Sequence, residues 1–150
     1  MKKITEISPE PHTFPQHGSW IIATGLGSGL LPFAPGTWGS FAALTAWMGI
    51  VILGLLLDLR KPLAAFVFLG PFLLWWIGSR SIKKIQSAFE NEDPPYIVID
   101  EWVGMWIALM PLASVIARDP FASWQEHLLR CALPFGLFRI LDIWKPGPIG

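Results

Sequence analysis

The 150-residue sequence contains little charge: Asp, Glu, Lys and Arg make up 15% of it, and the formal net charge is zero. A chain without a net positive field has no general means of attracting nucleic acid, so we expect no nucleic-acid partner. The single cysteine, Cys131, excludes an intramolecular disulfide and a cysteine metal site, and packing is its expected role. The remainder is strongly apolar, with 53% hydrophobic residues and a mean hydropathy of +0.50. This composition is typical of a small integral membrane protein.

The apolar residues fall into long runs. Residues 1–19 are polar and rich in proline, so we expect a cytosolic tail there, followed by a single membrane domain over 20–150. Four runs are expected to cross the bilayer: 41–57 extended back to Trp38, 63–78 with a kink at Gly70-Pro71, 96–117, and 128–144 with a kink near Pro134. Residues 79–92 have the spacing of an interfacial amphipathic helix or of a continuation of the second span. We therefore predict an all-α polytopic membrane protein of about four transmembrane helices with a cytosol-facing, Gly-rich loop.

The distribution of cationic residues predicts the orientation, because short loops rich in Lys and Arg stay in the cytosol. With the N-terminus inside, the cytosolic cations are Lys2, Lys3, Arg80, Lys83, Lys84 and Lys145, against Arg60, Lys61 and Arg118 outside. This topology places three motifs at the cytosolic face: the Gly-rich segment, a group of carboxylates before the third span, and the polar end of the fourth span.

The first motif is the Gly-rich segment 23–40. Its glycines allow a ligand to approach the backbone closely, and Thr37 or Ser40 is positioned to cap the first span, whose free amides favour an oxyanion such as phosphate. We take Thr24, Gly36, Thr37 and Ser40 as candidate substrate-binding residues. The alternative is a re-entrant turn whose glycines serve only helix packing.

The second motif contains Asp93, Asp100 and Glu101. If Asp93 caps a helix that begins at Pro94, then Asp100 and Glu101 lie two turns inside the third span, where an ionisable group costs roughly 2.5–3.5 kcal/mol. Three carboxylates would repel a phosphate monoester, so a phosphate site here implies Mg²⁺ between them. The alternative is structural: Asp93 serves only as a helix cap, and Asp100 or Glu101 pairs with Arg139.

The third motif combines Arg139, Asp142 and Lys145 near the end of the fourth span. Arg139 and Asp142 are three residues apart on one helix face and can form a local ion pair, which is the structural interpretation. In the functional interpretation Arg139 and Lys145 hold a phosphate while Asp142 binds the metal or orients water.

Together these motifs resemble those of the phosphatidylglycerophosphatase A family, small bacterial inner-membrane enzymes that convert phosphatidylglycerophosphate to phosphatidylglycerol. The likeness spans roughly 20–149. Its motifs are Ala-Thr-Gly-x-Gly-Ser-Gly and Ala-Pro-Gly-Thr-x-Gly-Ser within 23–40, Ile-Val-Ile-Asp-Glu-x-Val-Gly-Met-Trp over 97–106, and Phe-Arg-Ile-Leu-Asp-Ile-Trp-Lys-Pro over 138–146. The resemblance implies a Mg²⁺-dependent phosphoric monoester hydrolase of phospholipid metabolism, with phospholipids as its partners and its active site facing the cytoplasm.

In the expected mechanism, Asp93, Asp100 and Glu101 are the catalytic carboxylates and bind Mg²⁺, which activates a water for in-line attack on phosphorus. An aspartyl-phosphate route is the alternative. The family is expected to continue beyond Ile149-Gly150, so an inactive truncated homologue is an alternative function. A non-enzymatic membrane protein that binds a cation through the same carboxylates is another. The sequence predicts no oligomeric state.

Overall fold

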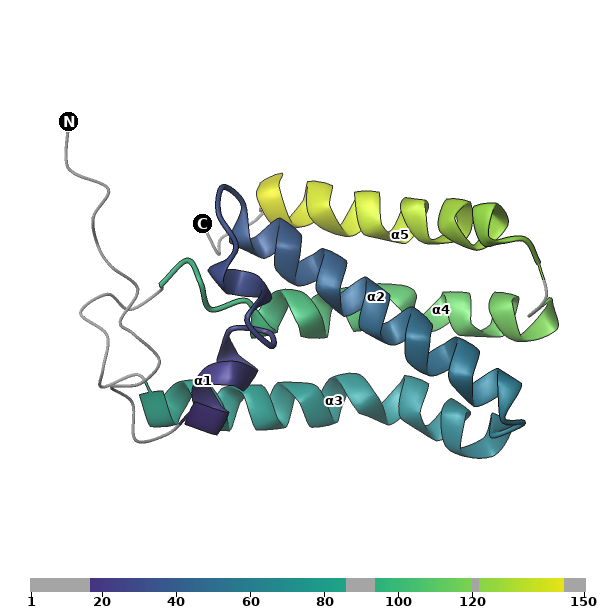
Figure 1. Ribbon diagram of the computed structural model, residues 1–150, viewed down its shortest axis with the longest axis horizontal. Helices are drawn as coiled ribbons and strands as arrows, with labels where there is room; N and C mark the ends of the chain where they lie inside the picture. The colour runs from purple at the N-terminus through teal and green to yellow at the C-terminus, as the bar shows by residue number, and fades with distance from the viewer. Residues whose placement is uncertain (1–16, 86–93, 120–121, 145–150) are drawn as a thin grey trace.

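Long helices run back and forth along the long axis of the molecule in the computed structural model, which describes residues 17–85, 94–119 and 122–144 (Figure 1). The elements are α1 (His17–Ala23), the short 3₁₀ helix η2 (Ser28–Leu30), α2 (Pro35–Leu56), α3 (Arg60–Ile85), α4 (Ile99–Arg118) and α5 (Trp124–Trp144). Helix α1 lies against one end of α3. The prediction of an all-α fold is confirmed.

Three of the described helices, α2, α3 and α4, are long and apolar enough to cross a membrane, which indicates membrane association. Helix α3 continues through Pro71, and residues 79–85 extend the same helix. The predicted fourth span is not confirmed. Helix α5 has sufficient length, but every stretch of eighteen residues in it carries at least three charged side chains, from Glu126, Arg130, Arg139 and Asp142. Such charges are costly in hydrocarbon.

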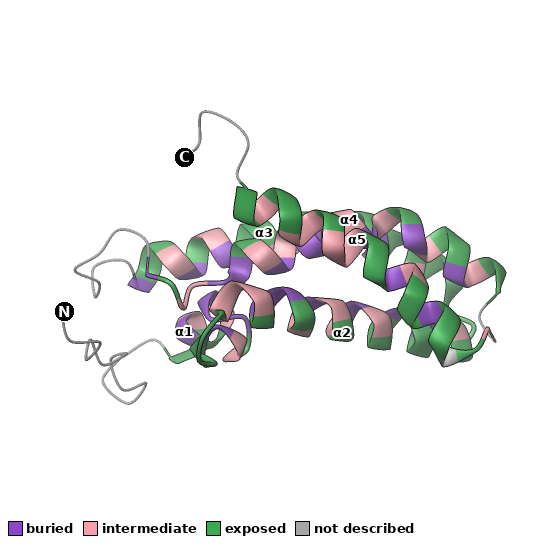
Figure 2. Ribbon diagram, turned by 90° about the horizontal axis from the view of Figure 1, so that it is seen from above, coloured by how far each residue is buried: buried purple, intermediate pink, exposed green. Residues whose placement is uncertain are grey.

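Helix α4 is the centre of the bundle. Its buried side chains recur every three or four residues and therefore follow one side of the helix; they are Ile99, Trp102, Met105, Trp106, Leu109, Leu112 and Ile116. Helices α2, α3 and α5 all pack against α4, and exposed residues cover the outside of the bundle (Figure 2). The indole Nε1 of Trp106 donates a hydrogen bond of 3.0 Å to the carbonyl of Ala43, which joins α4 to α2 inside the core.

Helix α2 begins earlier than the sequence analysis predicted. Pro35 occupies its first turn, and Ala34 is the N-cap residue without a side-chain hydrogen bond. Proline is favoured at the first helical position because its fixed φ suits the helix and it has no N–H to satisfy. The prediction that Thr37 or Ser40 caps this helix is therefore wrong; both residues lie inside it.

Helix α4 begins later than predicted, at Ile99 instead of Pro94. Pro95 disfavours the helical conformation at Pro94, and the amide of Val98 donates to the carbonyl of Ala23 at 3.1 Å rather than within a helix. The prediction that Asp100 and Glu101 lie two turns inside a helix is thus wrong. Both occupy its first turn, at the end of a candidate span, where negative charge is favoured by the helix dipole.

The alternating course of the helices determines which segments meet. The start of α2, the start of α4 and the end of α5 lie together, and we call this the α4 N-terminal end of the bundle (Figure 1). The turn between α2 and α3 and the connection between α4 and α5 lie at the opposite, α4 C-terminal end. The described residues of the three sequence motifs therefore share one end, as predicted.

Candidate functional site

Arg139 connects two helices at the α4 N-terminal end. Its Nη2 donates a hydrogen bond of 3.0 Å to Oγ1 of Thr37 in α2, and its Nη1 forms an ion pair with Asp142 one turn further along α5. The side chains of Arg139 and Asp142 are 14% and 29% exposed. The local pair expected in the structural interpretation is present, and the same guanidinium also reaches the Gly-rich segment.

Glu101 approaches the same place from α4. A Cβ built on Gly36 would lie 2.6 Å from Oε1 of Glu101 and 3.5 Å from Nη1 of Arg139, so this glycine leaves the space in which the two side chains come together. The other oxygen of Glu101, Oε2, is buried and has no hydrogen-bond partner within the described part of the chain. Asp100 and Asp142 add negative charge within electrostatic range of Glu101.

The glycines of segment 23–40 have different surroundings. A Cβ on Gly39 would lie 2.8 Å from Cβ of Val98, and Gly29 lies directly against the carbonyl of Tyr96, so both allow close packing of backbone segments. Gly36 instead faces charged side chains. The packing interpretation therefore applies at Gly29 and Gly39, and substrate binding at Gly36 stays a prediction.

Thr24 and Ser40 are fully buried, and their hydroxyl groups donate to backbone carbonyls one turn earlier, those of Trp20 at 3.0 Å and Gly36 at 2.9 Å. Of the predicted substrate-binding residues, the structure brings Gly36, Thr37 and Arg139 together. The role of Thr24 and Ser40 in binding a substrate stays a prediction. Asp93 and Lys145 lie outside the described residues.

Two aromatic residues, Trp102 and Phe138, fix the helices that carry Glu101 and Arg139. The sequence analysis did not identify either of them as part of the site. Trp102, which follows Glu101, donates from Nε1 to Oγ of Ser28 at 3.3 Å and so joins α4 to the Gly-rich segment. A Cβ on Gly104 would lie 2.5 Å from the ring of Phe138, the residue before Arg139. In the sequence, the only indication of these contacts is that an aromatic residue is adjacent to each charged one: Trp102 follows Glu101, and Phe138 precedes Arg139.

The carboxylate oxygens of Glu101 and Asp100 are suitable ligands for a hard cation that is bound through only a few protein groups. Among residues 17–85, 94–119 and 122–144, no three His, Cys, Asp or Glu side chains are grouped closely enough to hold one metal ion. Magnesium is commonly bound through one or two carboxylates plus substrate phosphate and water. The buried, unpartnered oxygen of Glu101 and the nearby carboxylate of Asp100 fit that mode.

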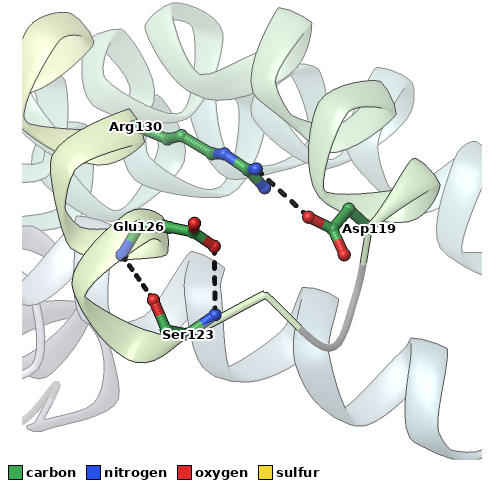
Figure 3. Close-up of polar contacts among 4 residues, drawn as sticks. All are labelled: Asp119, Ser123, Glu126 and Arg130. Atoms are coloured by element: carbon green, nitrogen blue, oxygen red, sulfur yellow. Dashed lines mark hydrogen bonds and ion pairs between the residues drawn. The ribbon is translucent and has the colours of Figure 1, made fainter.

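A second charged cluster lies at the α4 C-terminal end, across the connection between α4 and α5 (Figure 3). Nη2 of Arg130 lies 3.3 Å from Oδ2 of Asp119, with side chains 28% and 56% exposed. Ser123 and Glu126 exchange two hydrogen bonds, from the Ser123 amide to Glu126 Oε2 at 3.2 Å and from the Glu126 amide to Ser123 Oγ at 3.4 Å. This reciprocal pair is a capping box at the start of α5 and accounts for the cluster structurally.

Comparison with known proteins gives a consistent result. The family model described as phosphatidylglycerophosphatase A matches residues 21–150. A phosphatidylglycerophosphatase A of Escherichia coli K12 is 37% identical over 129 residues, covering 86% of this chain and 63% of the relative, and one of Haemophilus influenzae is 37% identical over 130 residues, covering 86% and 68%. No solved structure matches the chain.

A Bacteroides thetaiotaomicron protein with the provisional name phosphatidylinositol-3-phosphatase is 39% identical over 126 residues, covering 84% of this chain and 70% of the relative. The chain therefore spans 63 to 70% of the length of these three relatives.

Proposed function

The chain belongs to the phosphatidylglycerophosphatase A family, and we propose that it hydrolyses phosphatidylglycerophosphate to phosphatidylglycerol and inorganic phosphate. The observation that carries this proposal is the meeting of Arg139 and Glu101 at Gly36, where both side chains lie close to the position that a Cβ would occupy. A phosphatase needs fixed cationic donors for the phosphate oxygens and carboxylates that hold a metal, and these residues supply both.

Arg139 is the proposed phosphate-binding residue. Thr37 and Asp142 hold its guanidinium in one orientation and leave further N–H donors, including a buried Nε without a partner among the described residues. Because a guanidinium offers its donors in a planar fork, it can contact two oxygens of one phosphate. Lys145 is proposed to add a second positive charge.

Glu101 and Asp100 are proposed to hold Mg²⁺ together with Asp93, whereas Asp142, which pairs with Arg139, is proposed to orient water or the guanidinium instead of joining them as a third described ligand. When bound, this ion would neutralise phosphate charge and favour attack by water. Glu101 is the best supported ligand, because its Oε2 is buried and has no hydrogen-bond partner in the described part of the chain. We further propose that the site faces the cytoplasm at the bacterial inner membrane, which the distribution of Lys and Arg supports.

Phosphate release from purified protein in detergent micelles tests the activity. With phosphatidylglycerophosphate we expect phosphate release that depends on Mg²⁺ and stops when EDTA is added. Phosphatidylinositol 3-phosphate is the appropriate second substrate, because the Bacteroides relative carries that provisional name. If phosphate is released faster from phosphatidylinositol 3-phosphate, that lipid and not phosphatidylglycerophosphate is the preferred substrate. Release from neither lipid, with the helical fold intact by circular dichroism, would contradict the proposal and favour a non-enzymatic cation binder.

The nucleophile is tested separately by a single turnover in oxygen-18 water. We propose direct attack by water, which transfers the label to inorganic phosphate and leaves the carboxylates of Asp93, Asp100 and Glu101 unlabelled. Label in one of these carboxylates after turnover would instead indicate an aspartyl- or glutamyl-phosphate intermediate, because water that attacks the acyl carbon of that intermediate leaves its oxygen in the carboxylate and releases unlabelled phosphate. Attack of water on the phosphorus of such an intermediate would label the phosphate, so trapping the acyl-phosphate with hydroxylamine is the companion measurement.

A further inference from the structure

The segment between α1 and α2 exposes large apolar side chains beside the candidate site. Leu26, Leu30, Leu31 and Phe33, which we call the apolar lip, are 68%, 45%, 44% and 103% exposed. Phe33 has a φ of 73°, a conformation that a bulky residue rarely adopts. The sequence from Gly18 to Leu57 contains no Asp, Glu, Lys, Arg or His, so the segment carries no charge of its own beside these apolar side chains.

Contacts to α2 and to the segment around α4 fix the backbone of the apolar lip. Nε1 of Trp38 in the first turn of α2 donates to the carbonyl of Pro32 at 3.2 Å. On the other side, Ser28 accepts the hydrogen bond from Trp102, and Gly29 lies against the carbonyl of Tyr96. The exposed side chains are therefore a fixed part of the fold.

The lip continues an exposed surface of α2, a helix long and apolar enough to cross a membrane. Exposed residues of α2 recur at helical spacing along one side of this helix; they are Trp38, Phe41, Thr45, Gly49, Ile52 and Leu56, and Ile50 and Leu53 are exposed next to them. Trp38 begins this face and is half-exposed, as expected of a tryptophan at the membrane interface. Since the lip precedes Trp38 directly, its expected surroundings are the lipid head groups and upper acyl chains.

We propose that the apolar lip inserts into the bilayer interface next to the candidate site and guides a membrane-resident phospholipid toward Thr37 and Arg139. Thr37 lies in the first turn of α2, four residues after Phe33, so a phosphate held by Arg139 lies close to the surface in which the lip is proposed to be buried. The insertion rests on exposure and continuity with α2, whereas the guidance of substrate rests on the proposed lipid phosphatase activity.

Spin labelling tests the insertion without measuring activity. Cys131 is the one cysteine of the sequence and is buried, so a Cys131→Ala background permits labels at chosen positions. In vesicles of phosphatidylethanolamine and phosphatidylglycerol, a nitroxide at Phe33→Cys should collide with oxygen more often than with a water-soluble nickel complex. Ile52→Cys is the lipid-facing control and Asp58→Cys, in the turn at the opposite end, is the exposed polar control.

Nickel accessibility at position 33 equal to that at position 58 would overturn the insertion. Low accessibility to both reagents would overturn it as well, because it would mean that protein, from a second copy or another chain, covers the lip.

Guidance of substrate is tested with Phe33→Asn, because asparagine tolerates a positive φ and removes the ring without straining the backbone. With long-chain phosphatidylglycerophosphate in vesicles we expect kcat/KM to fall about tenfold, the effect of losing one buried aromatic side chain. With monomeric dihexanoyl phosphatidylglycerophosphate it should stay unchanged. Leu57→Asn, at the opposite end of α2, should alter neither rate.

An equal loss on both substrates, or no loss on vesicles, would overturn guidance. If the unaltered protein hydrolyses neither substrate, the proposed enzymatic function and guidance by the lip both fail, while the spin-label result still decides insertion.

Discussion

The two ends of the bundle contain the same types of charged side chain in different surroundings. At each end an arginine of α5 pairs with an aspartate: Arg139 with Asp142, and Arg130 with Asp119. The second pair is more exposed and lies beside a capping box that satisfies Glu126. The first is less exposed and lies beside Gly36 and the carboxylate of Glu101, whose other oxygen, Oε2, has no hydrogen-bond partner among the described residues. Each pair has a buried nitrogen without a partner among the described residues, Nε of Arg139 and Nη1 of Arg130. What distinguishes the candidate site is therefore the carboxylate of Glu101, with its buried and unpartnered Oε2, next to Arg139 at Gly36.

The largest effect is expected from removing the charge of Glu101. Glu101→Gln keeps the shape of the side chain but weakens binding of a divalent cation, so we expect kcat/KM for phosphatidylglycerophosphate to fall about 1,000-fold. The Mg²⁺ concentration for half-maximal rate should rise as well. Glu126→Gln makes the same change at the other end and should leave both quantities within twofold; equal losses in the two variants would remove the distinction between the ends.

Replacement of Arg139 by lysine should have the next largest effect. Lysine keeps the charge but cannot contact Thr37, Asp142 and a phosphate in one plane, so we expect a loss of about 300-fold in kcat/KM. The matched variant Arg130→Lys should retain normal kinetics. Steady-state rates in detergent micelles measure both, and an Arg139→Lys enzyme as fast as the unaltered protein would exclude Arg139 from phosphate binding.

Filling the space at Gly36 tests geometry without changing charge. The new methyl group of Gly36→Ala would lie 2.6 Å from Glu101 Oε1 and displace it, and because small displacements of catalytic groups are costly we expect a loss of about 100-fold in kcat. Gly49→Ala is the control in the same helix, since a Cβ there meets nothing within 4 Å. If both variants keep full activity, Gly36 serves packing alone.

A smaller effect is expected from Thr37→Val, which removes the oxygen that accepts from Arg139 Nη2 and conserves volume. Loss of this one hydrogen bond should lower kcat/KM about tenfold. Thr45→Val on the exposed face of α2 removes a hydroxyl that donates to the carbonyl of Phe41, and activity should be unaffected. Equal rates for the two valine variants would show that Thr37 does not position Arg139.

The smallest effect concerns stability at the α4 C-terminal end. Asp119→Asn breaks an exposed ion pair, so the free energy of unfolding should decrease by about 0.5 kcal/mol with no change in activity. Denaturant titration in micelles measures this change. A decrease in catalytic rate would mean that the connection between α4 and α5 influences the opposite end of the bundle.

Much of the arrangement could be predicted from sequence, because apolar runs separated by short polar turns fix an alternating path of helices. That path alone brings Gly36, Glu101 and Arg139 to one end. The first residues of α2 and α4 were predicted less accurately. Pro35 starts α2 before Thr37, and the bond from Val98 to Ala23 delays α4 until Ile99, a contact between residues 75 positions apart that local propensity does not encode.

The status of α5 also depends on neighbours rather than on its own pattern. Its apolar residues predicted a span, but its charged residues make the bilayer a poor environment for it by itself. Packing of α5 against α2 gives Arg139 a partner in Thr37, while Asp142 pairs with Arg139 within α5. The sequence predicted that Arg139 and Asp142 form either a local ion pair or part of a site. Helical periodicity could not predict the hydrogen bond from Arg139 to Thr37, because Thr37 belongs to another helix.

The contact of Gly104 with Phe138 has a pharmacological consequence. Arg139 is next to a ring that fills the space over a glycine, so the direction of its guanidinium depends on an apolar fit between α4 and α5. A small uncharged inhibitor that separated these two surfaces would misalign the arginine without competing for the phosphate. Such a compound would keep its potency at saturating lipid concentrations, which a mimic of the head group would not.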